Sequence, residues 1–101
     1  MPHPVVPADP GVTRQVLAET PDMMTVAFRF EDGAVGKLHD HRHVQATYVE
    51  AGRFTFHMAG KDYDLGPGDS LIIPSHVTHG CTCREAGTLI DTFTPRRDDF
   101  L

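Results

Sequence analysis

The stretch that decides the fold is Gly33-Ala-Val-Gly-Lys-Leu-His39-Asp-His41-Arg-His43-Val-Gln45-Ala-Thr-Tyr-Val-Glu-Ala-Gly52. It places histidines and a glutamine at alternate positions, and residues two apart in an extended chain point to the same face. A strand that carries His39 and His41 therefore directs two imidazoles to one point, and Gln45 joins them if the chain turns in between. Imidazoles that converge in this way commonly bind a divalent transition metal. A further ligand must come from elsewhere in the chain, and the best candidate is His79.

Length and charge limit the classes of protein to consider. At 101 residues the chain forms one domain with one core, and 40% hydrophobic and 23% charged residues are typical of a soluble globular protein. The formal net charge of −5 comes without a basic cluster, since only Arg96 and Arg97 are adjacent. We therefore expect no nucleic-acid partner. An anionic small molecule remains possible, because one buried arginine can bind it.

The sequence also predicts where the protein is found. No apolar run approaches membrane-spanning length, and Met1-Pro-His-Pro4 lacks the pattern of a signal peptide. Cys81 and Cys83 lie too close together for a usual disulfide along one strand. We therefore expect no membrane partner and a cytoplasmic, reducing location.

Alternating apolar residues and frequent turn residues predict an all-β, antiparallel sandwich or small barrel with about nine short strands. The stretches Ala51-Gly52 and Glu85-Ala86-Gly87 are interpreted as hairpin turns. Four prolines predict an irregular arm over residues 1–11, followed by the barrel domain over 12–101 with a terminal tail from residue 95. The expected strands are 12–18, 23–31, 35–41, 44–50, 53–58, 62–65, 70–74, 78–84 and 88–94.

The last predicted strand carries a carboxylate among apolar residues. Leu89, Asp91 and Phe93 share one face, so Asp91 points into the barrel if its two neighbours are core residues. A buried carboxylate has to be paired or functional. Two explanations stay open, namely an ion pair with Arg97 or another cation, and a role in acid/base chemistry.

The spacings of two segments resemble the two sequence motifs of the cupin superfamily. Gly33, His39, His41, Gln45 and Gly52 match the first motif, with glutamine where glutamate is usual. The second motif is matched by Gly68, Pro74 and His79, but His76 replaces a glycine and Cys83 stands where asparagine is expected. The resemblance implies a single-domain, RmlC-like jelly-roll β-barrel with one mononuclear metal near its axis.

Other segments resemble the KdgF-type cupins in particular: His39-x-His-x-His-x-Gln-x-x-Tyr48, Pro67-Gly-Asp-Ser-Leu-Ile-Ile-Pro74 and the C-terminus from Thr88. Members of that group convert 4,5-unsaturated monouronates, released from pectin or alginate, into open-chain keto acids. The resemblance implies that the metal ligands are His39, His41, Gln45 and His79. It also implies that the catalytic pocket contains Asp91, Phe93 and Arg97, and that two copies pair as a homodimer.

The chemistry of the ligand set fits this resemblance. Three imidazoles and an amide leave the charge of the ion uncompensated, which suits binding of an anionic substrate oxygen. These ligands do not distinguish Zn, Ni, Fe, Mn and Co. The resemblance thus implies an enzyme acting on a small anionic sugar acid. The alternatives are a metal-dependent dioxygenase, another small isomerase, and a non-catalytic metal- or ligand-binding cupin.

Several of these residues have a second interpretation. The three histidines could be polar core or surface residues, and Gln45 could be a hydrogen-bond donor behind the ligands. His43 is expected at the rim of the site, and His76 in an exposed loop. Cys81 and Cys83 are expected to act as small buried hydrophobes rather than ligands.

Overall fold

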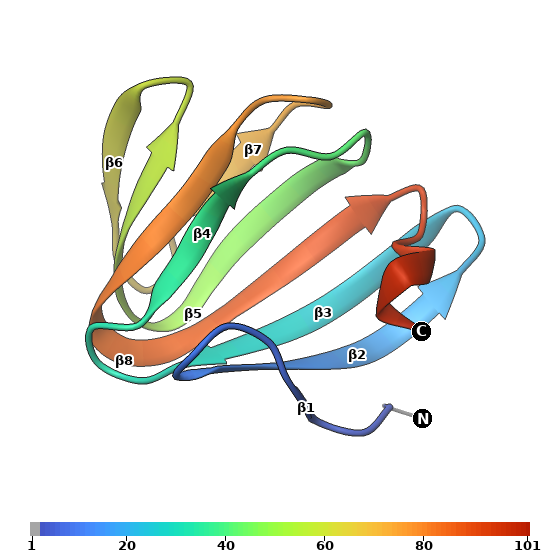
Figure 1. The fold of residues 1–101 in the computed structure, drawn as a ribbon, viewed down its shortest axis with the longest axis horizontal. Helices are drawn as coiled ribbons and strands as arrows, with labels where there is room; N and C mark the ends of the chain where they lie inside the picture. Colours follow the sequence, from blue (N-terminus) through green and yellow to red (C-terminus); the bar gives the residue numbers. More distant parts are fainter. Residues whose placement is uncertain (1–2) are drawn as a thin grey trace.

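Strands and tight turns account for nearly the whole chain, as the apolar alternation predicts (Figure 1). The computed structural model describes residues 3–101, so the first two residues of the predicted arm lie outside the described part. All strand pairs are antiparallel, and the all-β prediction is confirmed. The strands are β1 (Val6–Pro7), β2 (Val12–Thr20), β3 (Met23–Phe30), β4 (Val35–His39), β5 (Val44–Met58), β6 (Lys61–Leu65), β7 (Ser70–Ile73) and β8 (His79–Thr94), followed by the 3-10 helix η1 (Asp98–Phe100).

Two long strands, β5 and β8, run side by side through both layers of the barrel (Figure 1). The N-terminal half of β5 and the C-terminal half of β8 belong to one layer, with β3 paired to β8 and β7 paired to β5. The other halves belong to the second layer, where β4 pairs with β8 and β6 with β5. The strands β1 and β2 extend the first layer beyond β3.

The two hairpins predicted at Ala51-Gly52 and Glu85-Gly87 are wrong. At both places the chain continues as one strand, with register shifts between Val49 and Phe54. Gly52 has a φ of +83°, and a Cβ on Gly87 would lie only 2.0 Å from the carbonyl oxygen of Ala51. The glycines are therefore needed to let two bending strands touch, rather than to reverse the chain.

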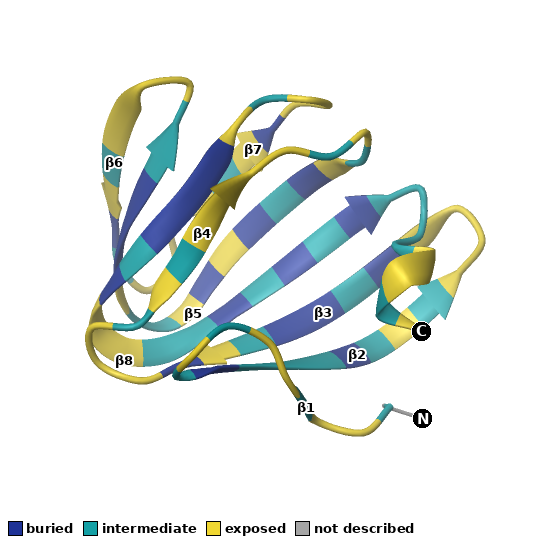
Figure 2. Cartoon of the chain, viewed as in Figure 1, coloured by how far each residue is buried: buried dark blue, intermediate teal, exposed yellow. Residues whose placement is uncertain are grey.

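The register shift also moves the buried face of β5 from odd to even residue numbers. Gln45, Thr47 and Val49 are buried before the bend, whereas Phe54 and Phe56 are buried after it (Figure 2). A change of one residue in register turns every following side chain to the other face. One continuous strand can thus face the interior of both layers.

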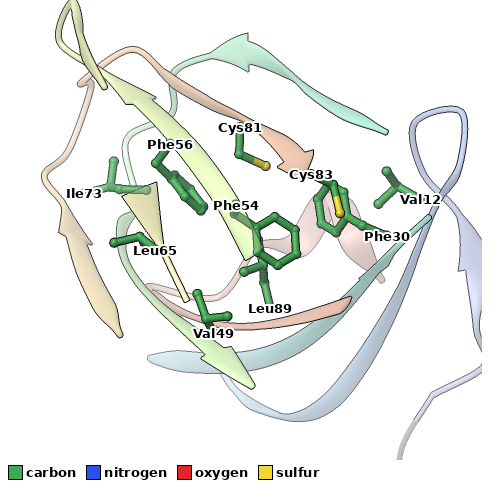
Figure 3. Close-up of a cluster of buried hydrophobic side chains, with 10 residues drawn as sticks. All are labelled: Val12, Phe30, Val49, Phe54, Phe56, Leu65, Ile73, Cys81, Cys83 and Leu89. Atoms are coloured by element: carbon green, nitrogen blue, oxygen red, sulfur yellow. The ribbon is translucent and has the colours of Figure 1, made fainter. Parts of the chain in front are cut away.

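A cluster of apolar side chains fills the barrel between the two layers (Figure 3). Its members include Phe30 and Phe54, whose rings meet edge to face with centroids 5.1 Å apart. Cys81 and Cys83 belong to the same cluster, and both are free thiols, as predicted. A second cluster lies toward the open end of the barrel and contains Val16, Met24, Val26 and Phe93.

Both chain ends differ in part from the prediction. The arm includes the two-residue strand β1, which pairs with Thr13 and Arg14 of β2. The tail ends in η1, whose Phe100 ring packs against Phe28 and Phe93. Among residues 3–101, no helix has the length and apolar character needed to cross a membrane.

Candidate active site

Three histidines from distant parts of the chain meet at one end of the barrel. His39 ends β4 and lies opposite His79, the first residue of β8, while His41 follows in the loop to β5. One ring nitrogen from each histidine lies within 4.8 Å of the others. The cluster reaches from the interior to the surface, because His79 is only 2% exposed whereas His39 is exposed.

Backbone carbonyl groups fix the orientation of all three rings. The Nδ1 atom of His39 lies 2.7 Å from the carbonyl oxygen of Lys37. The Nδ1 atom of His41 lies 3.0 Å from that of His43, and the Nδ1 atom of His79 lies 2.8 Å from that of Val77. A carbonyl oxygen only accepts, so Nδ1 carries the proton and Nε2 keeps its lone pair. Metal-binding histidines are usually held in this manner.

Gln45 completes the cluster from β5. Its Nε2 donates to the Thr47 hydroxyl oxygen at 2.9 Å and to Asp91 Oδ2 at 3.1 Å, which turns Oε1 toward His41. Oε1 lies 3.1 Å from Nε2 of His41. If Nδ1 of a neutral His41 donates to a carbonyl, these two atoms are both acceptors, and a cation between them would resolve the conflict.

The electrostatics of the cluster favour neutral ligands. Burial, together with the charges of the neighbouring His39 and His41, lowers the pKa of His79 to about 4. Burial, together with the charge of Arg97, also lowers the pKa of His41. The Nε2 of His79 is buried without a partner, which is costly unless something binds it. These residues therefore fit a divalent transition metal, and the predicted donors lie together.

Asp91 lies on β8 next to this cluster and faces the interior, as its position between Leu89 and Phe93 predicted. The residue is 5% exposed, and its Oδ1 is buried without a hydrogen-bond partner. Burial raises the pKa of Asp91 to about 7, against the lowering effects of a hydrogen bond from Thr47 and the charge of Arg97. A carboxyl group with such a pKa can both take and give a proton near neutral pH.

Arg97 does not form the ion pair with Asp91 that was one of the two explanations. Its Nε and Nη2 instead donate to the two carboxylate oxygens of Asp99, at 3.0 and 2.8 Å. The side chain is 13% exposed, and its Cζ lies 5.2 Å from the centre of the Phe93 ring. Among residues 3–101, Asp91 thus forms no salt bridge.

A single cavity of about 440 Å³ joins these groups. Its volume lies within the range of small-molecule sites. The walls are mixed, with the aromatic ring of Phe93 from the second apolar cluster, the aliphatic side chains of Val12 and Leu89 from the first, and a few polar groups. The predicted site residues that line it are His39, Gln45, His79, Asp91, Phe93 and Arg97.

The remaining predicted positions have simpler surroundings. His43 is half-buried near Phe93, with ring centroids 6.5 Å apart. His76 is exposed and adopts a φ of +62°, a conformation for which the glycine of the motif is better suited. Cys81 lines the cavity as a buried thiol, and burial raises its pKa to about 12.

One cavity residue, Arg14, was not predicted from the sequence. Arg14 of β2 lies two positions from the buried residues Val12 and Val16, and it lines the same cavity. The sequence signal for its inward direction was its position between Val12 and Val16, two apolar residues on the same face of the strand. A charged residue at that place is directed inward.

Comparisons with known proteins agree with this geometry. A family model described as "Cupin domain" matches residues 26–93. The pectin degradation protein KdgF of Dickeya dadantii (strain 3937) is 39% identical over 93 residues, which are 90% of this chain and 84% of that protein.

Two solved structures are also similar over almost the whole chain. KdgF from Halomonas sp. superposes with a TM-score of 0.92 at 42% identity, covering 98% of this chain and 92% of that chain. An RmlC-like cupin from Shewanella frigidimarina NCIMB 400 gives a TM-score of 0.93 at 41% identity, covering 97% and 88%. The chain therefore belongs to the cupin family, with the RmlC-like barrel and with KdgF proteins among its relatives.

Proposed function

We propose that the protein is an enzyme that opens the ring of 4,5-unsaturated monouronates and delivers linear keto acids. The observation that carries the proposal is that Asp91, Arg97, His39 and His79 line one cavity, with His41 beside the two histidines. The similarity to KdgF, a protein named for pectin degradation, supports the same substrate class.

The metal would be held by His39, His41, Gln45 and His79. An ion bound by these neutral ligands acts as a Lewis acid toward an anionic substrate oxygen. The donor set is compatible with Zn, Ni, Fe, Mn or Co. The structure contributes the fixed Nε2 lone pairs and the oriented amide oxygen described above.

Asp91 is the proposed acid/base. Its free Oδ1 takes the proton of the anomeric hydroxyl, and the bond between the anomeric carbon and the ring oxygen then breaks. An aldehyde and an enolate result. Asp91 then returns the same proton to carbon 4, so the enolate becomes a ketone and the substrate has been isomerised with no atom gained or lost.

Arg97 and Phe93 are proposed to position the substrate. Arg97 keeps Nη1 for a substrate oxygen, because Asp99 occupies Nε and Nη2. Phe93 contacts His41 edge to face, with centroids 5.7 Å apart, and forms the apolar wall of the cavity.

The test is a direct turnover assay. Metal-loaded protein is mixed with unsaturated monouronate made by a lyase, and loss of the conjugated double bond is followed in the ultraviolet after subtraction of spontaneous opening. We expect acceleration that disappears with a chelator. Stoichiometric metal without acceleration would refute the proposal, and oxygen uptake by the iron-loaded protein would then indicate the dioxygenase alternative.

We also propose that the protein works as a cytoplasmic homodimer. The outer face of β5 and β7 exposes apolar side chains, including Val44, Tyr48 and the 58% exposed Ile72, which a second copy would cover. The two free cysteines are compatible with a reducing compartment. Light scattering of the wild type and of Ile72→Asp tests the dimer, because a buried aspartate would dissociate it.

A further inference from the structure

Arg14 lies on the inner face of the barrel although it is charged. In β2 its neighbours of like parity, Val12 and Val16, are buried, and across the ladder it pairs with Phe28. The side chain lines the cavity that also contains Asp91 and Arg97. A guanidinium in such a place is unfavourable unless another group compensates for its lost hydration, because desolvating a charge is costly.

Within residues 3–101, Arg14 forms no ion pair, and its Nε is buried without a hydrogen-bond partner. Arg97 differs, since Asp99 holds it through two hydrogen bonds and balances its charge. Lys37 also lines the cavity, but its side chain is exposed and water solvates it. Arg14 is therefore the partly buried cation whose charge is left unbalanced.

Phe100 of η1 holds the two arginines in a fixed relation. The Cζ of Arg14 lies 4.3 Å from the ring centroid, and the Cζ of Arg97 lies 4.2 Å from the same centroid. A guanidinium that stacks on an aromatic ring keeps its in-plane N–H groups free for a ligand. The ring thus orients both guanidinium groups without using any of their N–H donors.

We infer that Arg14 binds the carboxylate of the substrate and makes the site selective for sugar acids over neutral sugars. This inference rests on the proposed function for the identity of the substrate. Arg14 supplies the charge and Arg97 adds one oriented donor from Nη1. The charge-assisted hydrogen bonds are those that a planar guanidinium makes best with a carboxylate.

The experiment compares Arg14→Gln, Arg14→Lys and Arg29→Gln with the wild type. Arg29 is exposed on the adjacent strand, and within residues 3–101 its side chain donates only to Gln15. Its variant therefore removes one positive charge without touching the cavity. For the lyase-made unsaturated monouronate, we expect Arg14→Gln to raise KM about tenfold or more, with a smaller change in kcat and with metal content unchanged. Arg14→Lys should recover part of the affinity, and Arg29→Gln should match the wild type.

A binding measurement separates this inference from the proposed function. Galacturonate has a carboxylate but no 4,5 double bond, so its binding by calorimetry needs no turnover; galactose is the neutral control. We expect weaker binding of galacturonate by Arg14→Gln and no change with galactose. If no protein turns over the unsaturated uronate, the proposed function fails while galacturonate binding still decides the role of Arg14. Equal KM and equal galacturonate binding in Arg14→Gln, Arg14→Lys and the wild type would overturn the inference.

Discussion

At His79, burial and one hydrogen bond decide which nitrogen can bind a metal. The carbonyl of Val77 accepts from Nδ1, so Nε2 is presented to His39 and His41 with its lone pair free. The low pKa, about 4, keeps that lone pair available across the neutral range. Each of the three imidazoles is thus oriented by a backbone carbonyl before any ion binds.

Replacing one of these ligands should remove the metal. We expect His41→Ala to lower metal affinity about 100-fold or more and to abolish turnover, because the remaining donors no longer surround the ion. Metal content after dialysis, measured by mass spectrometry, checks this. The matched control is His57→Ala, since His57 bonds Asp62 and Thr82 away from the cluster. Equal metal retention by both variants would contradict the assigned ligand set.

Asp91 should be separable from metal binding. Asp91→Asn keeps a side chain of the same shape and an oxygen that can accept from Gln45, but it cannot exchange a proton. We expect metal content to stay the same and kcat to fall about 10²- to 10⁴-fold. Asp62→Asn, an exposed carboxylate elsewhere, serves as the control. Turnover by Asp91→Asn at the control's rate would show that another group moves the proton.

At the level of elements, the two-layer fold depends on the bend that β5 and β8 share. A Cβ on Gly87 would overlap the carbonyl oxygen of Ala51, and a Cβ on Gly52 would lie 2.5 Å from the carbonyl oxygen of Glu85 and 2.7 Å from that of Ala86. The contact is between backbones, so a neighbour cannot rotate away. Both glycines therefore allow the close approach of β5 and β8 at the bend.

Substitution at the bend should therefore be costly for steric reasons. We expect Gly87→Ala to lower the free energy of unfolding by at least about 2 kcal/mol. The control pair is Gly52→Ala and Gly60→Ala. Both glycines have positive φ, but a Cβ on Gly60 would meet nothing within 4 Å, so the difference between the two isolates the steric cost. Urea unfolding with unchanged m-values measures each effect. Equal losses at 52 and 60 would mean that only φ matters.

The sequence predicted the strands well but not where they continue. Ala51-Gly52 has the composition of a hairpin turn, and the face of β5 changes parity there, so two strands were the natural interpretation. The buried face of β5 changes parity because the strand shifts register against β8. This shift depends on a partner strand far along the chain. Local patterns cannot reveal such a pairing.

The site was predictable to the extent that its residues share motifs or parity. The donors follow from the spacing of His39, His41 and Gln45, and the inward direction of Asp91 follows from its apolar neighbours. The Asp99 partner of Arg97 could not be predicted, because it depends on how η1 folds back. Arg14 could have been found from the parity of Val12 and Val16.

At the level of the whole molecule, the buried carboxyl group links folding to pH. The pKa of Asp91 is raised from 3.8 to about 7 on folding, so the native state binds the proton more tightly than the unfolded chain does. The resulting stabilisation is present below pH 4 and is lost as pH rises through 7. His79 has the opposite effect, because its pKa falls from 6.5 to about 4.

Comparison with Asp91→Asn isolates the carboxyl group, since His79 titrates in both proteins. Both proteins are studied metal-free, in the presence of a chelator. We expect the free energy of unfolding of the wild type, relative to that of Asp91→Asn, to fall by up to about 4 kcal/mol between pH 4 and 7 and to change little above pH 7. Urea unfolding at a series of pH values measures this difference. A difference that is constant with pH would mean that Asp91 keeps an ordinary pKa.

The long pairing of β5 with β8 has a consequence for the order of folding. Gln45 and Asp91 are 46 residues apart in sequence, yet they touch only because these two strands align over their full length. Contacts of this kind form late, since a long loop must close first. Before β8 takes its place, the chain therefore offers an ion the donors that lie close in sequence, His39, His41 and Gln45. His79 completes the set only after β8 has paired with β4 and β5.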